Sequence, residues 1–193
     1  MTKNYYDENY DEYFKNTIDA DMSEMISKFL AYLKPGARIL DAGCGVGRDT
    51  KVFLQKGYEV DAFDSSIQMV RLSTEYTGQM TKLLRFEDLD YVDEFDGIWA
   101  CASLLHVSRE DLPNVFRRLE RALRKGGVLY ASFKVGDDYS EGGRDFTCFS
   151  QDEFTFFEPM RDFLKISSVV ITKDSKKNTE MTEWINFFCL VCK

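Results

Sequence analysis

Short apolar runs alternate with amphipathic segments from residue 38 to residue 133, and this alternation constrains the fold more than any other feature of the chain. Each apolar run has the length of a buried strand, and the segments between them carry apolar residues at helical spacing. A strand, a helix and a second strand bring the chain back parallel to its start, so the repeat predicts a parallel sheet with helices on both faces. The expected strands are residues 38–41, 58–64, 83–86, 95–102 and 128–133.

The alternation then stops. A polar stretch at residues 135–147 is predicted to be a loop, and Ser150 with Glu153 is predicted to cap a helix rich in phenylalanine. Two further strands are expected at residues 164–172 and 184–192, and the polar linker between them lacks helical periodicity. Because strands joined without a crossover helix pair antiparallel, these two should form a hairpin. The pattern predicts an α/β fold, doubly wound and mostly parallel, with an antiparallel last strand.

The amino-terminal segment has a different composition. It is acidic and rich in tyrosine, so residues 1–20 are expected to form an N-terminal arm or lid. A helix is expected next, with Asp21 and Glu24 spaced as a capping box. At 193 residues the chain is long enough for one buried core and too short for two ordinary domains, which predicts a single domain over residues 1–193.

The charge balance is acidic, with 25 Lys and Arg residues against 33 Asp and Glu residues and a formal net charge of −8. This balance disfavours nucleic acid as a partner, because binding to a phosphate backbone relies on clustered Lys and Arg side chains. No apolar run approaches the roughly 18 residues of a membrane span, and the amino terminus lacks the apolar segment of a secretory signal. We therefore expect a cytoplasmic protein with no membrane partner.

The cysteines fit that compartment. There are five, an odd number, and each lies inside or beside an apolar run, which indicates reduced thiols and not a disulfide framework. Cys189 and Cys192 have the spacing of a zinc or redox pair, but they fall in an expected strand, where residues three apart point to opposite faces. No second pair and no nearby histidine completes a zinc site, so the sequence predicts no metal site.

The turn after the first expected strand is rich in glycine and runs from Asp41 to Gly47. In open parallel sheets the loop at this position contacts a bound nucleotide or cofactor. A dinucleotide fingerprint requires its third glycine one residue later, where this chain has Arg48. The spacing G-x-G-x-G therefore argues against a dinucleotide, and we expect this turn to bind another nucleotide-like ligand.

The segment from Ile39 to Asp49 resembles the first motif of class I S-adenosylmethionine-dependent methyltransferases. Further positions agree with that family, in its order and spacing, over almost the whole chain. The resemblance implies a seven-stranded Rossmann-like sheet with an antiparallel last strand, and S-adenosyl-L-methionine as the cofactor. Within the family, the chain is similar to small single-domain bacterial enzymes of the tellurite-resistance type.

The resemblance also implies which residues contact the cofactor. Asp64 is expected to accept hydrogen bonds from both ribose hydroxyls, and Asp88 to accept one from the adenine amino group. Arg48 is expected either to pair with the methionine carboxylate or to solvate the first turn of its helix. The full set of expected cofactor-binding residues is Asp41, Gly43, Gly45, Gly47, Arg48, Asp64, Ser65, Glu87, Asp88, Leu89 and Ala102.

The sequence constrains the acceptor side less. His106 is the only histidine, and it follows the fourth expected strand, where an acceptor would approach. It is a candidate general base, with pocket lining and ordinary packing as the alternatives. Tyr6 and Tyr10 in the arm, and Tyr139 after the fifth strand, are candidate substrate contacts. The alternatives are an arm that only packs on the domain and a solvated loop.

Methyl transfer from a sulfonium is an in-line displacement that depends mainly on alignment, so dedicated catalytic residues are not required. We expect methyl transfer from S-adenosylmethionine to a small-molecule acceptor, and the acidic balance favours small or cationic acceptors. One alternative is methylation of RNA or protein. Another, from a different class, is a regulatory protein that binds S-adenosylmethionine without turnover. A monomer or a homodimer is expected.

Overall fold

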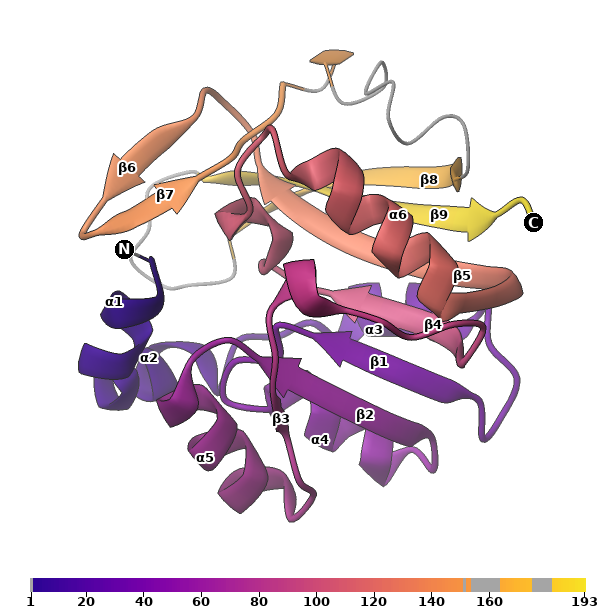
Figure 1. The fold of residues 1–193 in the computed structure, drawn as a ribbon, viewed down its shortest axis with the longest axis horizontal. Coiled ribbons are helices and arrows are strands. Elements are labelled where there is room, and N and C mark those ends of the chain that lie inside the picture. The colour runs from indigo at the N-terminus through magenta and orange to yellow at the C-terminus, as the bar shows by residue number, and fades with distance from the viewer. Residues whose placement is uncertain (1, 151, 154–163, 175–181) are drawn as a thin grey trace.

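The computed structural model describes residues 2–150, 152–153, 164–174 and 182–193. Seven strands form one sheet in the order β3-β2-β1-β4-β5-β9-β8, and the first five in the chain are parallel (Figure 1). Strand β9 lies between β5 and β8 and runs antiparallel to both. The strands are β1 (Arg38–Ala42), β2 (Glu59–Asp64), β3 (Lys82–Leu83), β4 (Phe95–Ala100), β5 (Leu123–Lys134), β8 (Leu164–Lys173) and β9 (Glu183–Val191). The predicted doubly wound sheet with its antiparallel strand is confirmed.

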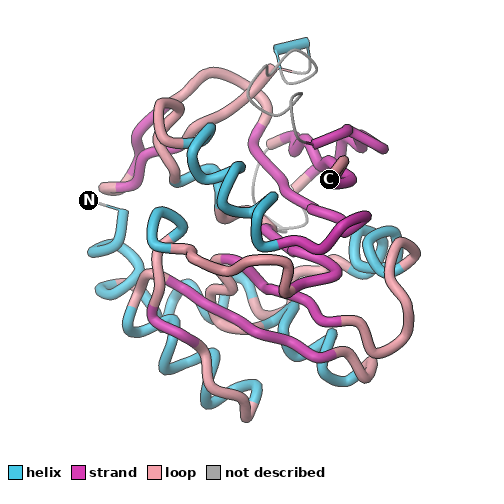
Figure 2. Tube along the Cα trace, turned by 45° about the vertical axis from the view of Figure 1, so that its right-hand side comes forward, coloured by secondary structure: helices cyan, strands magenta, loops and turns pink. Residues whose placement is uncertain are grey.

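Helices cover both faces of this sheet (Figure 2). They are α3 (Ser23–Leu30), α4 (Arg48–Gln55), α5 (Ile67–Thr77) and α6 (Leu112–Ala122), with short 3-10 helices η1 (Phe86–Asp88) and η2 (Leu104–His106). On one face α3 and α4 bury Phe29 and Phe53 against Trp99, and on the other α6 buries its apolar stripe. The stripe of α6 includes Phe116 and Leu119, both fully buried, at the spacing of one helical face.

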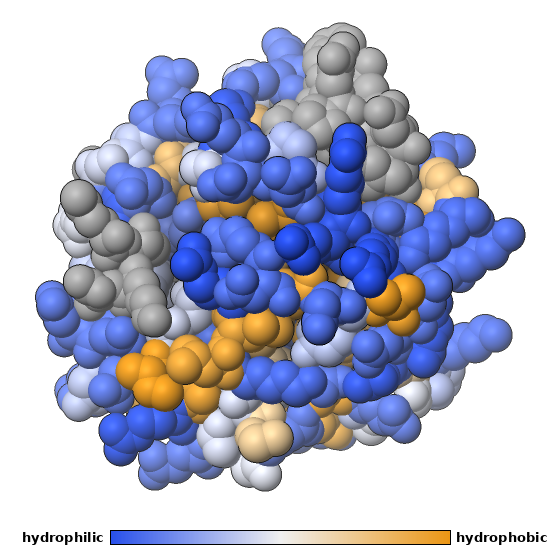
Figure 3. All heavy atoms as spheres, viewed as in Figure 1, coloured by the Kyte–Doolittle hydropathy of each residue, from blue (hydrophilic) through white to orange (hydrophobic). Residues whose placement is uncertain are grey.

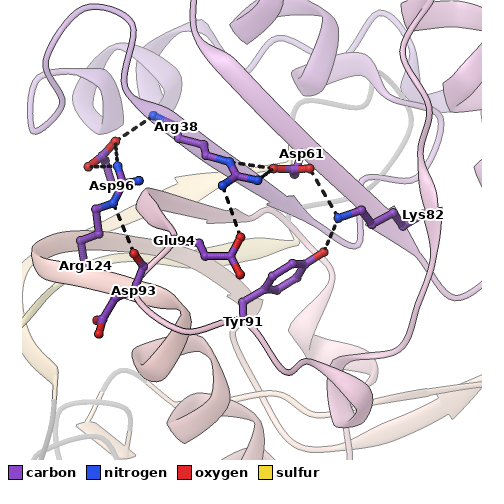
Figure 4. A network of polar contacts seen from close by, with 8 residues as sticks. All are labelled: Arg38, Asp61, Lys82, Tyr91, Asp93, Glu94, Asp96 and Arg124. Atoms are coloured by element: carbon purple, nitrogen blue, oxygen red, sulfur yellow. Dashed lines mark hydrogen bonds and ion pairs between the residues drawn. The ribbon is translucent and has the colours of Figure 1, made fainter.

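An ion-pair network joins the strands near their amino ends (Figure 4). Arg38 of β1 pairs with Asp61 of β2 at 2.6 Å and with Glu94 at 3.3 Å. Arg124 of β5 pairs with Asp96 of β4 at 2.9 Å. Further members of the network are Lys82, Tyr91 and Asp93. The network ties the amino half of the sheet together and leaves the carboxyl ends free for a site.

Two further pieces of the chain sit at the carboxyl ends of the parallel strands. Helices α1 (Thr2–Glu8) and α2 (Tyr10–Thr17) form the amino-terminal arm. Strands β6 (Tyr139–Glu141) and β7 (Arg144–Phe146) form a separate two-stranded hairpin. In Figure 1 the arrowheads of β1 and β2 point toward the side of the molecule that carries both pieces.

The hairpin corrects the prediction of a loop at residues 135–147. Its strands are three residues each, mostly exposed and polar, so they show no alternation of buried and exposed residues. Gly142 and Gly143 form its turn with positive φ values of 57° and 76°, the backbone signature of a tight two-residue hairpin. In the sequence, this pair of adjacent glycines was the one feature that could have predicted the hairpin.

Three smaller expectations also differ. The capping box of Asp21 with Glu24 does not form, because Asp21 accepts a hydrogen bond from the Ser23 N–H at 2.8 Å and Met22 takes the N-cap position. The strand expected at residues 83–86 is shorter, since its last residue begins η1. The resemblance to the methyltransferase family also implies a second glycine-containing turn, at residues 124–129 before the fifth strand, but these residues lie within β5, where the register with β4 shifts.

Two predictions near the carboxyl terminus are tested only in part. Ser150 does cap the following residues, because its hydroxyl accepts from the Glu153 N–H at 3.0 Å. Most of the predicted phenylalanine-rich helix, and most of the linker before β9, lie outside the described residues. The predicted hairpin of the last two strands is confirmed. Cys189 is buried in β9, whereas Cys192 is exposed and follows the end of the strand.

The face in Figure 3 is mostly hydrophilic, with apolar residues gathered mainly toward the lower left, the side on which Figure 1 shows α5. Exposed apolar residues of this part of the chain include Ile67, Met80 and Leu83. Some exposed apolar surface is ordinary for a folded domain. None of the helices in the described ranges has the length and apolar character needed to cross a membrane.

Candidate active site

A cavity of about 460 Å³ opens at the carboxyl ends of β1, β4 and β5. The glycine turn forms its floor, the loop between β4 and η2 one wall, the hairpin β6–β7 another, and the arm its cover. A volume of this size suits a small organic ligand. Lining residues include Tyr6, Tyr13, Asp41, Gly43, Gly45, Arg48, Ala102, His106, Lys134, Arg144, Phe146 and Trp184.

The glycines of the turn are required by conformation and by space. Gly43 has a φ of 73°, and a Cβ there would lie 2.6 Å from the Cβ of Ser103. Gly47 has a φ of 82°, and its Cβ would lie 2.5 Å from Ser73 Oγ of α5. Residues with a side chain rarely adopt such φ values, and real Cβ contacts are never this short. The turn therefore approaches both the β4–η2 loop and α5 through bare backbone.

Two buried carboxylates hold the turn from below. Asp41 at the end of β1 accepts a hydrogen bond from Thr50 Oγ1 at 2.6 Å, and Asp49 accepts one from Trp99 Nε1 at 2.8 Å. Burial and the negative charge of Asp49 raise the pKa of Asp41. Arg48 pairs with Asp49 at 2.7 Å and donates to the Thr17 carbonyl of the arm at 3.2 Å. Its guanidinium thus lines the cavity but already has protein partners.

Asp64 stands at the end of β2, beside the turn. One of its carboxylate oxygens accepts from the Gly45 N–H and the other from the Ser66 N–H, both at 2.9 Å. Each oxygen keeps a lone pair that suits a ligand hydroxyl. Burial raises the pKa of Asp64 despite these hydrogen bonds. Of the residues that the structure describes, Asp64 and Ser65 lie beside the cavity but are not part of its lining.

The residues expected around adenine lie in and after η1. Glu87 pairs with Arg85 at 3.3 Å, and Asp88 is exposed. The Leu89 side chain is buried, and its N–H donates to the Phe86 carbonyl at 3.4 Å. The Phe86 ring would lie 3.6 Å from a Cβ on Gly43, which puts η1 next to the turn. In the described part of the chain, these three expected residues do not line the cavity.

The arm covers the turn and contacts three loops. Asp7 accepts a hydrogen bond from the Ser66 hydroxyl at 2.5 Å, at the start of α5. The Tyr13 ring covers the turn, because a Cβ on Gly45 would lie 3.6 Å from one of its ring carbons. Tyr6 bonds to His106 on the opposite wall. The arm therefore bridges the whole width of the site.

The other two expected tyrosines lie apart from this contact. Tyr10 is half-buried in α2, and Tyr139 is 37% exposed in β6. Tyr139 stacks on Phe146 with ring centroids 4.6 Å apart. Among the described residues, neither Tyr10 nor Tyr139 lines the cavity, whereas Tyr6 does.

His106 is held in one tautomer by its two partners. Its Nδ1 lies 2.9 Å from the Asp145 carbonyl oxygen, which only accepts, so Nδ1 carries the proton. Nε2 is then the acceptor for the Tyr6 hydroxyl at 2.7 Å. Burial lowers the pKa of His106 to about 4, so the imidazole is neutral at pH 7. Burial also raises the pKa of Tyr6 to about 12, and the nearby Arg144 guanidinium opposes that rise.

Lys134 and Arg144 also line the cavity, and sequence reasoning did not single them out. Lys134 ends β5, where side chains face the ligand in folds of this kind. Because the sequence predicts the end of the fifth strand, this position could have indicated Lys134 as a site residue. Arg144 lies in the hairpin that was taken for a loop, so only the structure could bring it to the site.

Comparison with known proteins agrees with this geometry. Residues 13–158 match the family model described as a methyltransferase domain. The chain belongs to that family. The match begins within the arm helix α2 and includes the glycine turn and the strands from β1 to β7, so the predicted class I S-adenosylmethionine-dependent methyltransferase is confirmed in family, enzyme class and cofactor.

Among its curated relatives, phosphoethanolamine N-methyltransferase 3 of Arabidopsis thaliana is 32% identical over 105 residues. The matched part is 50% of this chain but 21% of that enzyme, so this chain spans only a fraction of its length.

Among solved structures, 1,6-didemethyltoxoflavin-N1-methyltransferase of Burkholderia thailandensis, with 1,6-didemethyltoxoflavin and S-adenosylhomocysteine bound, superposes with a TM-score of 0.79 at 21% identity. The superposition covers 98% of this chain and 85% of that one. A TehB-like S-adenosylmethionine-dependent methyltransferase of Corynebacterium glutamicum superposes with a TM-score of 0.70 at 19% identity, covering 95% and 97% of the two chains.

Proposed function

We propose that this domain transfers the methyl group of S-adenosylmethionine to a small-molecule acceptor, which binds in the cavity between the arm and the carboxyl ends of β4 and β5. The observation that carries the proposal is that the family's glycine turn and the Tyr6–His106 pair line the same cavity. The relatives named above act on phosphoethanolamine and 1,6-didemethyltoxoflavin, which are both small molecules.

The residues around the turn fit the cofactor. Gly43 and Gly45 line the cavity and carry no side chain, so a ligand next to the Tyr13 ring can approach the backbone of the turn closely. Asp64 keeps acceptor capacity for two hydroxyls, which matches a ribose. We propose that Asp41, Gly43, Gly45, Gly47, Asp64 and Ser65 hold the sugar and methionine parts and that Glu87, Asp88 and Leu89 lie along the adenine. Arg48 contributes positive charge, and Ala102 lines the transfer path.

The bound cofactor supplies an electrophilic methyl group, to which the acceptor lone pair bonds as the carbon–sulfur bond breaks and its electron pair stays on sulfur. The protein aligns the two reactants. Tyr6 and His106 hold a hydrogen-bond pair against the acceptor, and the low pKa of His106 makes it a weak base. We infer that His106 orients the Tyr6 hydroxyl, which accepts the hydrogen bond of the acceptor. The arm, residues 2–17, acts as a lid that excludes water.

Calorimetric titration with S-adenosylmethionine tests the cofactor site. The native chain should bind, and Asp64→Ala should weaken binding at least ~10-fold, because two charge-assisted hydrogen bonds are lost. Glu59→Ala, at the opposite, exposed end of β2, is the matched control and should bind like the native chain. Equal affinity of Asp64→Ala and the native chain would remove the proposed ribose contact.

Incubation with a labelled methyl donor and cell extract tests the acceptor class. Label should appear in the small-molecule fraction. Label in RNA or protein alone would replace this proposal with the second function considered above. Binding of the cofactor with no labelled product in any fraction would favour a regulatory protein without turnover.

A further inference from the structure

We propose that the acceptor carries an anionic group, a carboxylate or a phosphate ester, which Arg144 and Lys134 bind inside the cavity. This inference rests on the proposed function and adds the chemistry of the substrate. Both side chains line the cavity, as does the glycine turn. In Figure 1 the hairpin that carries Arg144 lies above the arm, next to the end of β5.

Arg144 is held by rings and lacks a close carboxylate. Its guanidinium carbon lies 4.0 Å from the centroid of the Tyr5 ring and 5.1 Å from that of Phe146. Its only ion pair among the described residues is with Glu141 at 3.9 Å, and that carboxylate is 68% exposed. The Nε atom of Arg144 is buried and has no hydrogen-bond partner. An unmade hydrogen bond on a buried charged group is costly, so such a group usually has a partner.

Lys134, like Arg144, lies against aromatic rings and lacks a close carboxylate. Its ammonium lies 4.3 Å from the centroid of Phe146 and 5.9 Å from that of Trp184. It donates a hydrogen bond to the Tyr139 hydroxyl. No carboxylate pairs with it in the described ranges of the chain. Two cations thus approach the same buried aromatic ring, Phe146, and neither has a close counter-charge.

Three other arginines of the chain form closer ion pairs. Arg38, Arg109 and Arg124 each have a carboxylate oxygen between 2.6 and 2.9 Å away. Both cations line the same partly desolvated cavity, so an anion bound there is attracted by both positive charges. Arginine binds carboxylate and phosphate oxygens in a bidentate fork, and lysine adds a point charge.

The position of the two cations fits the reaction. Both cations lie near His106. Burial is the main cause of the lowered pKa of His106, and the positive charges of Arg144 and Lys134 lower that pKa further. Arg144 also lies beside the Tyr6 hydroxyl. An anion held by Arg144 and Lys134 therefore leaves the rest of a small molecule pointing toward Tyr6 and the glycine turn, where the methyl group arrives. Because Tyr5 of the arm stacks on Arg144, the same contact joins the arm to the anion-binding wall.

Calorimetry on the full chain, saturated with S-adenosylhomocysteine, tests the proposal with three matched probes: phenyl phosphate, benzoate and neutral benzyl alcohol. The native chain should bind at least one of the two anions, and benzyl alcohol at least ~10-fold more weakly. Binding of phenyl phosphate alone supports a phosphate ester, and binding of benzoate alone supports a carboxylate. Equal binding of benzyl alcohol and the anions overturns the proposal, as does binding of none of the three.

The variants Arg144→Gln and Lys134→Gln should each weaken anion binding ~10-fold or more, with affinity for S-adenosylhomocysteine unchanged. Arg117→Gln and Lys125→Gln remove exposed cations from α6 and β5 and serve as matched controls. Unchanged anion binding in both cavity variants overturns the proposal. Unchanged affinity for S-adenosylhomocysteine shows that the variants are folded. Failure of the native chain to bind S-adenosylhomocysteine contradicts the proposed function. The anion titrations are then repeated in the absence of S-adenosylhomocysteine, and their result decides the anion-binding proposal alone.

Discussion

Replacement of Gly47 by alanine measures how closely the glycine turn must approach α5. Gly47 has a φ of 82°, where an L-residue with a Cβ is destabilised by about 1–2 kcal/mol. The new Cβ would also lie 2.5 Å from Ser73 Oγ and 2.8 Å from Thr77 Cγ2. Ser73 Oγ is buried and accepts a hydrogen bond from Thr81 at 2.8 Å, so it cannot move without loss. Overpacking of this kind costs about 1–3 kcal/mol.

Gly57→Ala is the matched control. Gly57 has nearly the same φ, 84°, but a Cβ there would meet no atom within 4 Å. The backbone strain and the effect on the unfolded chain are therefore shared, and the difference between the two variants isolates the contact with α5. We expect Gly57→Ala to lower the free energy of unfolding by about 1 kcal/mol and Gly47→Ala to lower it by about 2–4 kcal/mol.

Urea denaturation followed by circular dichroism gives both free energies. A titration with S-adenosylhomocysteine should show weaker binding for Gly47→Ala and native binding for Gly57→Ala, because only the first residue belongs to the turn. Equal destabilisation of the two variants would refute the reasoning, since it would mean that the approach to Ser73 carries no energetic consequence.

Three further predictions concern His106, Tyr6 and the ion pair of Asp61 with Arg38. The unfolded chain binds a proton at His106 more readily than the folded chain between about pH 4 and pH 6.5, since burial lowers the pKa from 6.5 to about 4. The free energy of unfolding should therefore fall by up to about 3 kcal/mol as the pH drops through this range, and His106→Gln, compared by urea denaturation at pH 7 and pH 5, should lose that part of the fall. Tyr6→Phe should lower the rate of methyl transfer ~10-fold and leave the affinity for S-adenosylhomocysteine unchanged, because it removes only the hydroxyl beside the acceptor; a native rate would exclude the proposed hydrogen bond between the Tyr6 hydroxyl and the acceptor. Asp61→Asn should destabilise the fold by about 1–2 kcal/mol at low salt and by less in 1 M NaCl, as it breaks the half-buried pair with Arg38; an effect independent of salt would contradict an electrostatic origin.

The fold was predictable because its signals are local. Between residues 38 and 133, the pattern of apolar and polar residues within each segment indicates whether it is a strand or a helix. Gly78 marks the end of α5, because glycine adopts the left-handed conformation found there. The order of the strands has no such local signal. That β4 pairs with β1 and β5, and that β9 inserts between β5 and β8, is decided by packing across the sheet. The hairpin β6–β7 was missed because its short exposed strands carry no period, and only Gly142 and Gly143 mark it.

The glycine turn could be located for the same reason, since Asp41 to Gly47 is one continuous segment, and its contact with the cofactor stays a prediction. The acceptor side is assembled from four separate segments. Tyr6 comes from the arm, His106 from η2, Lys134 from the end of β5 and Arg144 from a hairpin, and no spacing rule connects them. Their meeting depends on the tertiary contact of the arm with the loops.

Charge shows most directly why composition alone misjudges a site. The net charge of −8 favours cationic acceptors, yet the cavity wall carries two cations without close carboxylates. Net charge is a sum over the whole surface, whereas binding depends on the charges within a few ångströms of the ligand, inside the screening length of about 8 Å. Carboxylates also line this cavity, but Asp41 and Asp49 are hydrogen-bonded to Thr50 and Trp99, and in the described part of the chain none pairs with Lys134. An acidic chain can therefore present a basic wall at its active site, and the charge of its substrate follows from that wall.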